Sequence, residues 1–187
     1  EGDVEKREIW AKVIQRRGEI GYPYIMFHDT TNNNTVDVYK DKGAKINNSN
    51  LCSEIALHNS EEESFVCVLS SMNVLHYDEW KDTTMIRDLI RLLDNVLQFF
   101  IDNAGDEISR ARYSATQERS LGLGAMGWHS YLHKHNIPFE STQAALENIK
   151  IFSHIKSDAV IETEELARKR GECPDMEGTG RRNSHLL

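Results

Sequence analysis

The sequence has little cysteine, little proline, a deficit of positive charge and no long apolar run. Three cysteines occur among 187 residues, without a Cys-x-x-Cys pair, which excludes a disulfide framework and suits a reducing compartment. No stretch approaches the roughly 20 apolar residues that span a bilayer, and no signal segment opens the chain. We therefore expect a cytoplasmic protein that makes no contact with a membrane.

The charge balance is acidic, with 22 Lys and Arg against 30 Asp and Glu and a formal net charge of −8. Nucleic-acid-binding surfaces are basic, so we expect no direct contact with nucleic acid. The length permits one domain with a sizeable core, and the sequence contains no internal repeat, low-complexity tract or linker. Residues 1–187 are therefore interpreted as part of one domain.

What the sequence does contain is a thiol between an amide and a carboxylate, in the run Asn50–Glu54. Asn50, Cys52 and Glu54 are spaced i, i+2, i+4, so an extended backbone would direct all three side chains to the same side. A thiol can act as a nucleophile, a hydrogen-atom donor or a metal ligand, a carboxylate can take a proton, and an amide can hold hydroxyl groups. The spacing predicts a reaction centre without choosing among these chemistries.

A second cysteine, Cys67, follows fifteen residues later between two valines. A lone cysteine among apolar neighbours is usually an inert core residue. By the same reasoning Asn50 could be a turn residue that bonds its own backbone, and Glu54 could be an exposed charge. We interpret the cluster as functional because two such coincidences around one cysteine are less expected than a shared role.

A zinc site is the main alternative that the residue types suggest. Cys52, His58, Cys67 and His76 supply two thiols and two imidazoles within twenty-five residues. Their spacings do not match the short ligand pairs of structural zinc sites. We therefore predict no metal ligand in this chain.

Apolar periodicity and the placement of glycine and polar clusters predict the secondary structure. In the first part of the chain we expect a helix over 4–17, a β run over 24–27, a polar loop over 29–35, an exposed turn over 59–63 and a strand over 64–70 that is buried on both faces. Three helices should follow, over 85–100, from 122–128 to 135, and from a cap at 141–142 to 169. This alternation predicts an α/β architecture with at least some parallel strands.

The segments Ser49–Ile55 and Phe65–Asn73 closely resemble the large catalytic subunit of ribonucleotide reductase. Four more segments resemble the same family in the same order, namely Gly21–Phe27, Glu118–Gly124, Pro138–Ser141 and Arg182–Leu187. The resemblance implies a ten-stranded α/β barrel with the reactive cysteine on a central finger loop. Residues 1–187 would then form a partial catalytic barrel domain.

The resemblance also implies that ribonucleotides are reduced to 2′-deoxyribonucleotides, the precursors of DNA, by a thiyl-radical mechanism. Cys52 matches the cysteine that becomes the thiyl radical and removes the 3′ hydrogen atom of the substrate. Glu54 matches the general base for the 3′ hydroxyl, and Asn50 matches the amide that binds the substrate hydroxyls. Leu51 and Ser53 complete the matched substrate-binding run.

Cys67 matches one half of the dithiol that supplies two electrons in this family and ends as a disulfide. Cys173 matches no motif of the family and is interpreted as a spectator. In the family the second thiol lies well upstream, and a phosphate-binding loop and radical-transfer tyrosines lie beyond the segments matched here. We therefore expect an internal fragment that is inactive alone.

The partners that the resemblance implies are a ribonucleotide substrate, a second copy of the large subunit, a small di-metal subunit that supplies the radical, and an external dithiol reductant of the thioredoxin or glutaredoxin type. No cofactor is expected to bind this segment. Two alternatives stay open, an adenosylcobalamin-dependent reductase of the same superfamily and a catalytically incomplete chain that acts only in assembly with complementary segments. The run Gly124–Leu132 resembles the di-metal class more closely.

Overall fold

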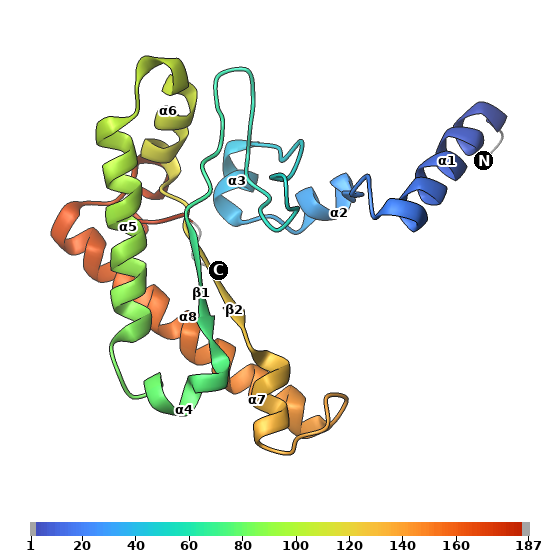
Figure 1. Ribbon diagram of the computed structural model, residues 1–187. Coiled ribbons are helices and arrows are strands. Elements are labelled where there is room, and N and C mark those ends of the chain that lie inside the picture. The colour runs from blue at the N-terminus through green and yellow to red at the C-terminus, as the bar shows by residue number, and fades with distance from the viewer. Residues whose placement is uncertain (1–2, 185–187) are drawn as a thin grey trace.

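The computed structural model describes residues 3–184, in which two short parallel strands are joined by a helical crossover (Figure 1). Strand β1 (Leu69–Asn73) pairs with β2 (Gly122–Met126) along its whole length. Between them lie η1 (Val74–His76), α4 (Tyr77–Trp80), α5 (Met85–Asn103), η2 (Asp106–Ile108) and α6 (Ser109–Glu118). Parallel strands require such a crossover because a tight turn cannot return the chain to the same end of the sheet. The predicted α/β class with parallel strands is confirmed.

Helices α5 and α8 (Thr142–Arg170) pack against each other beside the strand pair, and α7 (Trp128–Lys134) precedes α8. The Ser141 side chain caps α8 by accepting a hydrogen bond from the Ala144 backbone N at 3.1 Å, and Gly171 follows the last turn. Apolar side chains at helical spacing are buried on both helices: Ile86, Ile90, Leu93 and Leu97 of α5, and Ile151, Ile155, Ala159 and Leu166 of α8. Both helices confirm the expectations from the sequence.

Residues 26–65, here called the small lobe, have a core of their own. Tyr39, Ile46 and Leu57 are buried at its centre. The lobe contains α2 (His28–Asn33), α3 (Asp37–Lys42) and a long irregular segment. Residues 66–184, here called the main body, hold the larger core and end with η3 (Pro174–Met176) and the segment after it.

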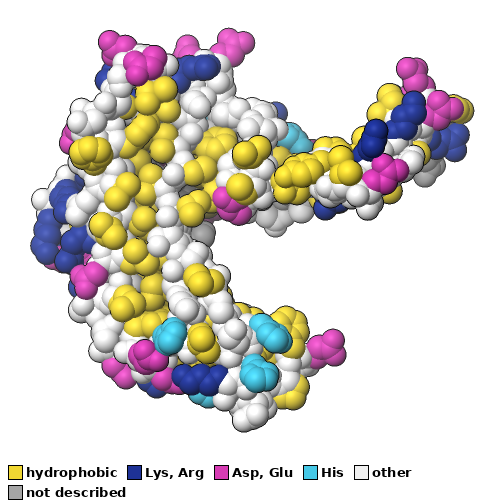
Figure 2. Space-filling view, viewed as in Figure 1, with side chains coloured by type: hydrophobic (Ala, Val, Ile, Leu, Met, Phe, Trp, Pro, Cys, Tyr) yellow, Lys and Arg dark blue, Asp and Glu magenta, His cyan; other side chains and the backbone are white. Residues whose placement is uncertain are grey.

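Helix α1 (Val4–Ile20) extends away from both parts and buries none of its residues (Figure 1). The Asp3 side chain caps its start, and Gly21 ends it with a left-handed φ of 79°. Figure 2 shows further apolar side chains on the surface along α5 and beside the strands. On α5, the exposed apolar residues include Leu92 and Phe99. An exposed apolar surface of this kind is typical of a face that packs against another surface or a ligand.

A buried carboxylate, Asp94 of α5, joins the parts of the main body. It has no exposed surface and accepts hydrogen bonds from Arg119 Nη2 at 2.8 Å, Arg182 Nε at 3.0 Å and Arg170 Nη1 at 2.8 Å. Asn183 Nδ2 donates another at 3.2 Å. Burial alone would raise the pKa of Asp94, but the charges and hydrogen bonds of Arg119 and Arg182 hold that pKa below its ordinary value. One carboxylate therefore connects α5, the end of α6, the end of α8 and the segment that follows η3.

The N-terminal predictions were partly wrong. Residues 24–27 form no strand, because within residues 3–184 no strand lies beside them to take their hydrogen bonds. Residues 28–33 are helical rather than a loop, and the Thr31 hydroxyl and the Asn34 amide bond backbone carbonyls one turn back. The exposed turn at 59–63 is confirmed by a hydrogen bond from Ser60 N to Glu63 O at 3.0 Å.

The strand expected over 64–70 begins only at Leu69, and of its residues only Met72 is buried, so it is not covered on both faces. Residues Gly122–Met126 form β2 instead of opening a helix, and Gly127 follows as the residue before α7. A Cβ on Gly122 would lie 3.1 Å from the Leu69 Cβ, a contact so tight that Leu69 would have to shift by a few tenths of an ångström. Glycine here serves strand packing, and the helix begins only at Trp128.

The last three residues of the Arg182–Leu187 motif lie outside the described residues. Over residues 3–184, no helix combines the length and the apolar character that a membrane span requires.

The Asp94 network generates a stability prediction. Asp94→Asn should lower the free energy of unfolding by about 3–5 kcal/mol, because it leaves buried guanidinium groups without their counter-charge. The matched control is Asp102→Asn on the exposed side of the same helix, which should change stability by less than about 0.5 kcal/mol. Denaturant unfolding of both variants beside the parent protein measures the difference. Equal midpoints for the two variants would contradict the anchoring role.

The lowered pKa of Asp94 also fixes the direction of its pH dependence. A carboxyl whose pKa is lower in the folded protein than in the unfolded chain stabilises the fold at neutral pH. This contribution is lost as the pH falls through the lowered pKa of Asp94.

Candidate active site around Cys52 and Cys67

The run Asn50–Glu54 is a tight turn closed by the side chain of Asn50. Asn50 Nδ2 donates to Glu54 Oε1 at 2.6 Å, and Asn50 Oδ1 accepts from the Ile55 backbone N at 3.0 Å. Ser53 N donates to Asn50 O at 3.1 Å, and Ser53 takes a left-handed φ of 68°. The extended backbone expected from the i, i+2, i+4 spacing is therefore wrong. The turn, and not the pleat of a strand, brings Asn50 and Glu54 together.

Asparagine suits this turn because its short amide can bond nearby backbone groups. Asn50 thus acts as a turn residue and as a partner of Glu54 at the same time. At the tip of the turn Leu51 is 88% exposed, and Cys52 is exposed as well. Cys52 is therefore presented outward and is not buried in a core.

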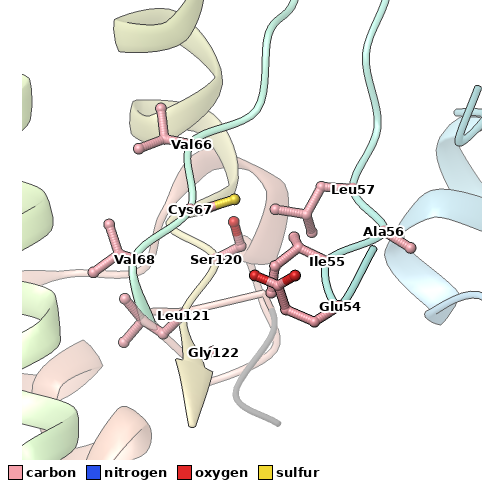
Figure 3. A pocket seen from close by; sticks show the side chains of 10 residues that line it. All are labelled: Glu54, Ile55, Ala56, Leu57, Val66, Cys67, Val68, Ser120, Leu121 and Gly122. Carbon is pink, nitrogen blue, oxygen red and sulfur yellow. The ribbon is translucent and has the colours of Figure 1, made fainter. Parts of the chain in front are cut away.

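A cavity of about 140 Å³ lies next to the turn, between the small lobe and the main body. It is lined from the small lobe by Glu54, Ile55, Ala56 and Leu57, and from the main body by Val66, Cys67, Val68, Ser120, Leu121 and Gly122. Figure 3 shows the Glu54 carboxylate, the Cys67 thiol and the Ser120 hydroxyl directed into this space. The structure thus brings Glu54 and Cys67 to one cavity, whereas Leu51, Cys52 and Ser53 do not line it.

The Cys67 thiol is partly buried and lies near the negatively charged carboxylate of Glu54. Burial raises the pKa of the Cys67 thiol, and the nearby Glu54 carboxylate raises it further. The thiol is therefore kept protonated at neutral pH, although Cys67 is exposed. Cys173 is the inert cysteine of this chain, because it is 2% exposed and its pKa is raised to about 12, chiefly by burial.

The geometry does not support the zinc alternative. His58 Nε2 lies 2.9 Å from Glu63 Oε2, and His76 Nδ1 lies 2.7 Å from Glu79 Oε1, so both imidazoles have carboxylate partners. Among residues 3–184, no group of three His, Cys, Asp or Glu side chains is arranged to hold a metal ion.

Three residues near the site were missed by reasoning from the sequence. Ser120 lines the cavity, and Tyr39 donates a buried hydrogen bond of 2.5 Å to Glu118 Oε2. Glu118 and Ser120 belong to a segment noticed only for its family resemblance. An acidic residue and a tyrosine 79 positions apart form no local pattern, so nothing in the sequence indicates that they meet.

The strand pair and its crossover place the chain in the α/β class, with two thiols near one interlobe cavity. A family model described as "Ribonucleotide reductase, barrel domain" matches residues 1–186. The chain therefore belongs to the ribonucleotide reductase barrel-domain family.

Relatives with curated names agree with this family. The chain is 48% identical over 187 residues to a protein named putative ribonucleoside-diphosphate reductase large subunit of Frog virus 3, with 98% of this chain and 33% of that protein covered. It is 43% identical over 184 residues to the ribonucleoside-diphosphate reductase large subunit of Invertebrate iridescent virus 3, with 98% of this chain and 29% of that protein covered.

A solved structure shows the same arrangement of the backbone. The class Id ribonucleotide reductase alpha subunit of Actinobacillus ureae matches with a TM-score of 0.92 and 47% sequence identity, covering 100% of this chain and 36% of that chain. The chain thus spans about a third of the length of the relatives that it matches.

The exposures of the three cysteines generate a labelling prediction. In the folded protein a thiol-alkylating reagent should modify Cys52 and Cys67, and Cys173 should react only after unfolding. Glu54→Gln should shift the pH profile of Cys67 alkylation to lower pH, because it removes a negative charge that raises the pKa of that thiol. Peptide mapping by mass spectrometry over a pH series measures both effects. Glu62→Gln on the exposed turn is the control and should leave the profile unchanged.

Proposed function

We propose that this chain is the barrel segment of a ribonucleoside-diphosphate reductase large subunit that carries the radical-forming cysteine. The whole protein would reduce ribonucleotides to 2′-deoxyribonucleotides for DNA synthesis. The observation that carries the proposal is the hydrogen-bonded turn Asn50–Glu54, which presents Cys52 beside the cavity of Cys67. The names of the relatives support a ribonucleoside diphosphate as the substrate.

The turn divides radical and proton chemistry among neighbours. Cys52, exposed at the tip, is proposed to form the thiyl radical that takes the 3′ hydrogen atom of the ribose. Glu54 is proposed to take the proton of the 3′ hydroxyl. The Asn50 amide has two N–H donors and gives one to Glu54, so the second can bind a substrate hydroxyl. Leu51 and Ser53 would contact the substrate as parts of the same turn.

Cys67 is proposed to supply one of the two thiols that are consumed in each turnover. Two thiols become a disulfide, the substrate gains two electrons, and the 2′ hydroxyl leaves as water. Cys173 is a poor candidate for the second thiol because it is buried. We propose that this thiol belongs to another part of the full protein, and that an external dithiol of the thioredoxin or glutaredoxin type restores the pair.

We also propose that the chain forms part of a closed barrel in the full-length protein. Strands β1 and β2 are proposed to be two of ten strands, with the Asn50–Glu54 turn as a finger loop inside the barrel. The apolar side chains left exposed along α5 and beside the strands (Figure 2) fit neighbouring strands and helices of such a barrel. The likeness to a reductase alpha subunit over the whole chain also supports it.

The proposed partners are a small di-metal subunit that supplies the radical and a second copy of the large subunit. The similar solved structure is a class Id alpha subunit, which favours the di-metal class over an adenosylcobalamin-dependent enzyme. A catalytically incomplete chain is the remaining alternative, and turnover by the full-length protein with its small subunit would exclude it.

The role of Cys52 is tested by Cys52→Ser in the full-length protein with its small subunit. Deoxynucleotide formation should fall to background while nucleotide binding stays unchanged, because the stronger O–H bond of serine does not yield the radical. The control is Cys173→Ala, which removes the buried thiol and should leave reduction intact. Chromatography measures the deoxynucleotide that each variant forms. Reduction retained by Cys52→Ser would rule out Cys52 as the radical-forming residue.

The role of Cys67 is tested by counting products per enzyme. Cys67→Ser should prevent the productive disulfide, so that repeated turnover with an external dithiol is lost while substrate still binds. Rapid-quench measurement of deoxynucleotide per active site checks this. Multiple turnovers at the parental rate would show that Cys67 is an inert neighbour of the site.

A further inference from the structure

The cavity that Glu54 and Cys67 line has one wall on the small lobe and the other on the main body. Its shape therefore depends on how these two parts are joined. Several contacts cross this joint. Lys42 Nζ lies 2.7 Å from Asp175 Oδ2, and the Ser64 backbone N donates to the Ser114 hydroxyl at 3.1 Å. These contacts are partly exposed, whereas the hydrogen bond of 2.5 Å from the Tyr39 hydroxyl to Glu118 Oε2 is buried.

Tyr39 holds the segment that leads away from the reactive turn. Its side chain is 1% exposed, and its ring belongs to the small-lobe core with Leu57. Its hydroxyl oxygen also accepts a hydrogen bond of 3.0 Å from the His58 backbone N, four residues after Glu54. One oxygen atom therefore links the backbone that follows Glu54 to the carboxyl of Glu118.

Glu118 holds the opposite wall of the cavity. It is the last residue of α6, is 4% exposed, and lies two residues before Ser120, which lines the cavity. The next residue, Arg119, is bound to the buried carboxylate of Asp94. A shift of Glu118 would therefore be resisted by the core of the main body, which makes it a firm attachment for the small lobe.

We propose that Tyr39 and Glu118 are positioning residues, whose hydrogen bond sets the separation between the turn that bears Cys52 and Glu54 and the wall that bears Cys67. The catalytic part of this inference rests on the proposed function, whereas the geometric part stands on the contacts alone. Neither residue lines the cavity, so both act through the segments that they hold.

The electrostatics of Glu118 agree with a buried attachment. Burial raises the pKa of Glu118 to about 7, and the Tyr39 hydrogen bond opposes this rise. The charged side chains that face it are Lys42 of α3, Asp175 of η3 and Glu63 of the loop. Because the folded pKa lies above the usual value near 4.5, this group stabilises the fold at low pH, and the contribution is lost as the pH rises through about 7. A glutamine here would accept the same hydrogen bond without this titration.

The test measures how far Glu54→Gln shifts the pH profile of Cys67 alkylation in the full-length protein. The size of this shift reports how close the Glu54 carboxylate lies to the Cys67 thiol. In a Tyr39→Phe background this effect should shrink or vanish, because the released segment moves Glu54 away from Cys67. In a Tyr113→Phe background it should persist, since Tyr113 is exposed on α6. Glu118→Gln should preserve the effect, and Glu118→Leu, which cannot accept the hydrogen bond, should abolish it.

Reduction by the same full-length variants with the small subunit supplies the second readout. Tyr39→Phe should lower kcat about 10- to 100-fold with little change in KM, because misplacement of reacting groups impairs chemistry more than binding. Glu118→Gln should retain most of the activity.

The two readouts separate the two claims. If the parent protein reduces no nucleotide, the proposed function fails, while alkylation still reports on Tyr39. If the effect of Glu54→Gln on Cys67 is the same with and without the Tyr39 hydroxyl, or is absent from the parent protein, the positioning role is wrong even when reduction is observed.

Discussion

Asp94 imposes the constraint on which the main body depends. A carboxylate without exposed surface is costly to bury, and here its charge is balanced by Arg119, Arg170 and Arg182. Arg119 also adopts a left-handed φ of 44°, which costs a non-glycine residue about 1–2 kcal/mol, so the ion pair holds the chain in a turn that it would otherwise leave. Residues 120–122, which follow this turn directly, line the cavity, so the ion pair holds the chain next to one wall of the site.

The candidate site is divided between two parts of the chain with separate cores. The small lobe carries the turn of Asn50, Cys52 and Glu54, and the main body carries Cys67 and Ser120. The two cysteines therefore lie in different surroundings, with Cys52 on an exposed turn and Cys67 at the wall of a cavity. Burial and the nearby Glu54 carboxylate raise the pKa of the Cys67 thiol, which favours its protonated form.

Local signals predicted the long helices well. Ser141 and Gly171 mark the two ends of α8, and the apolar stripe of α5 covers the length that the structure shows. The glycine-rich run at 122–127 led to the wrong prediction of a helix. Glycine is found both at helix starts and where two strands approach closely, and only the pairing with β1 decides between these two structures. The spacing of Asn50 and Glu54 suggested an extended backbone, but a turn brings the two side chains together.

The sequence alone established the family and the chemical types of the candidate residues. The amide, the two thiols and the carboxylate lie close together along the chain, so their pattern can be recognised before any packing is known. Capping and helical periodicity are equally local, since they act over three or four residues. The Tyr39–Glu118 hydrogen bond joins positions 79 residues apart, and the Arg182–Asp94 pair joins positions 88 apart. Such contacts exist only after the cores have formed, because burial both creates the need for a partner and brings the partner within reach.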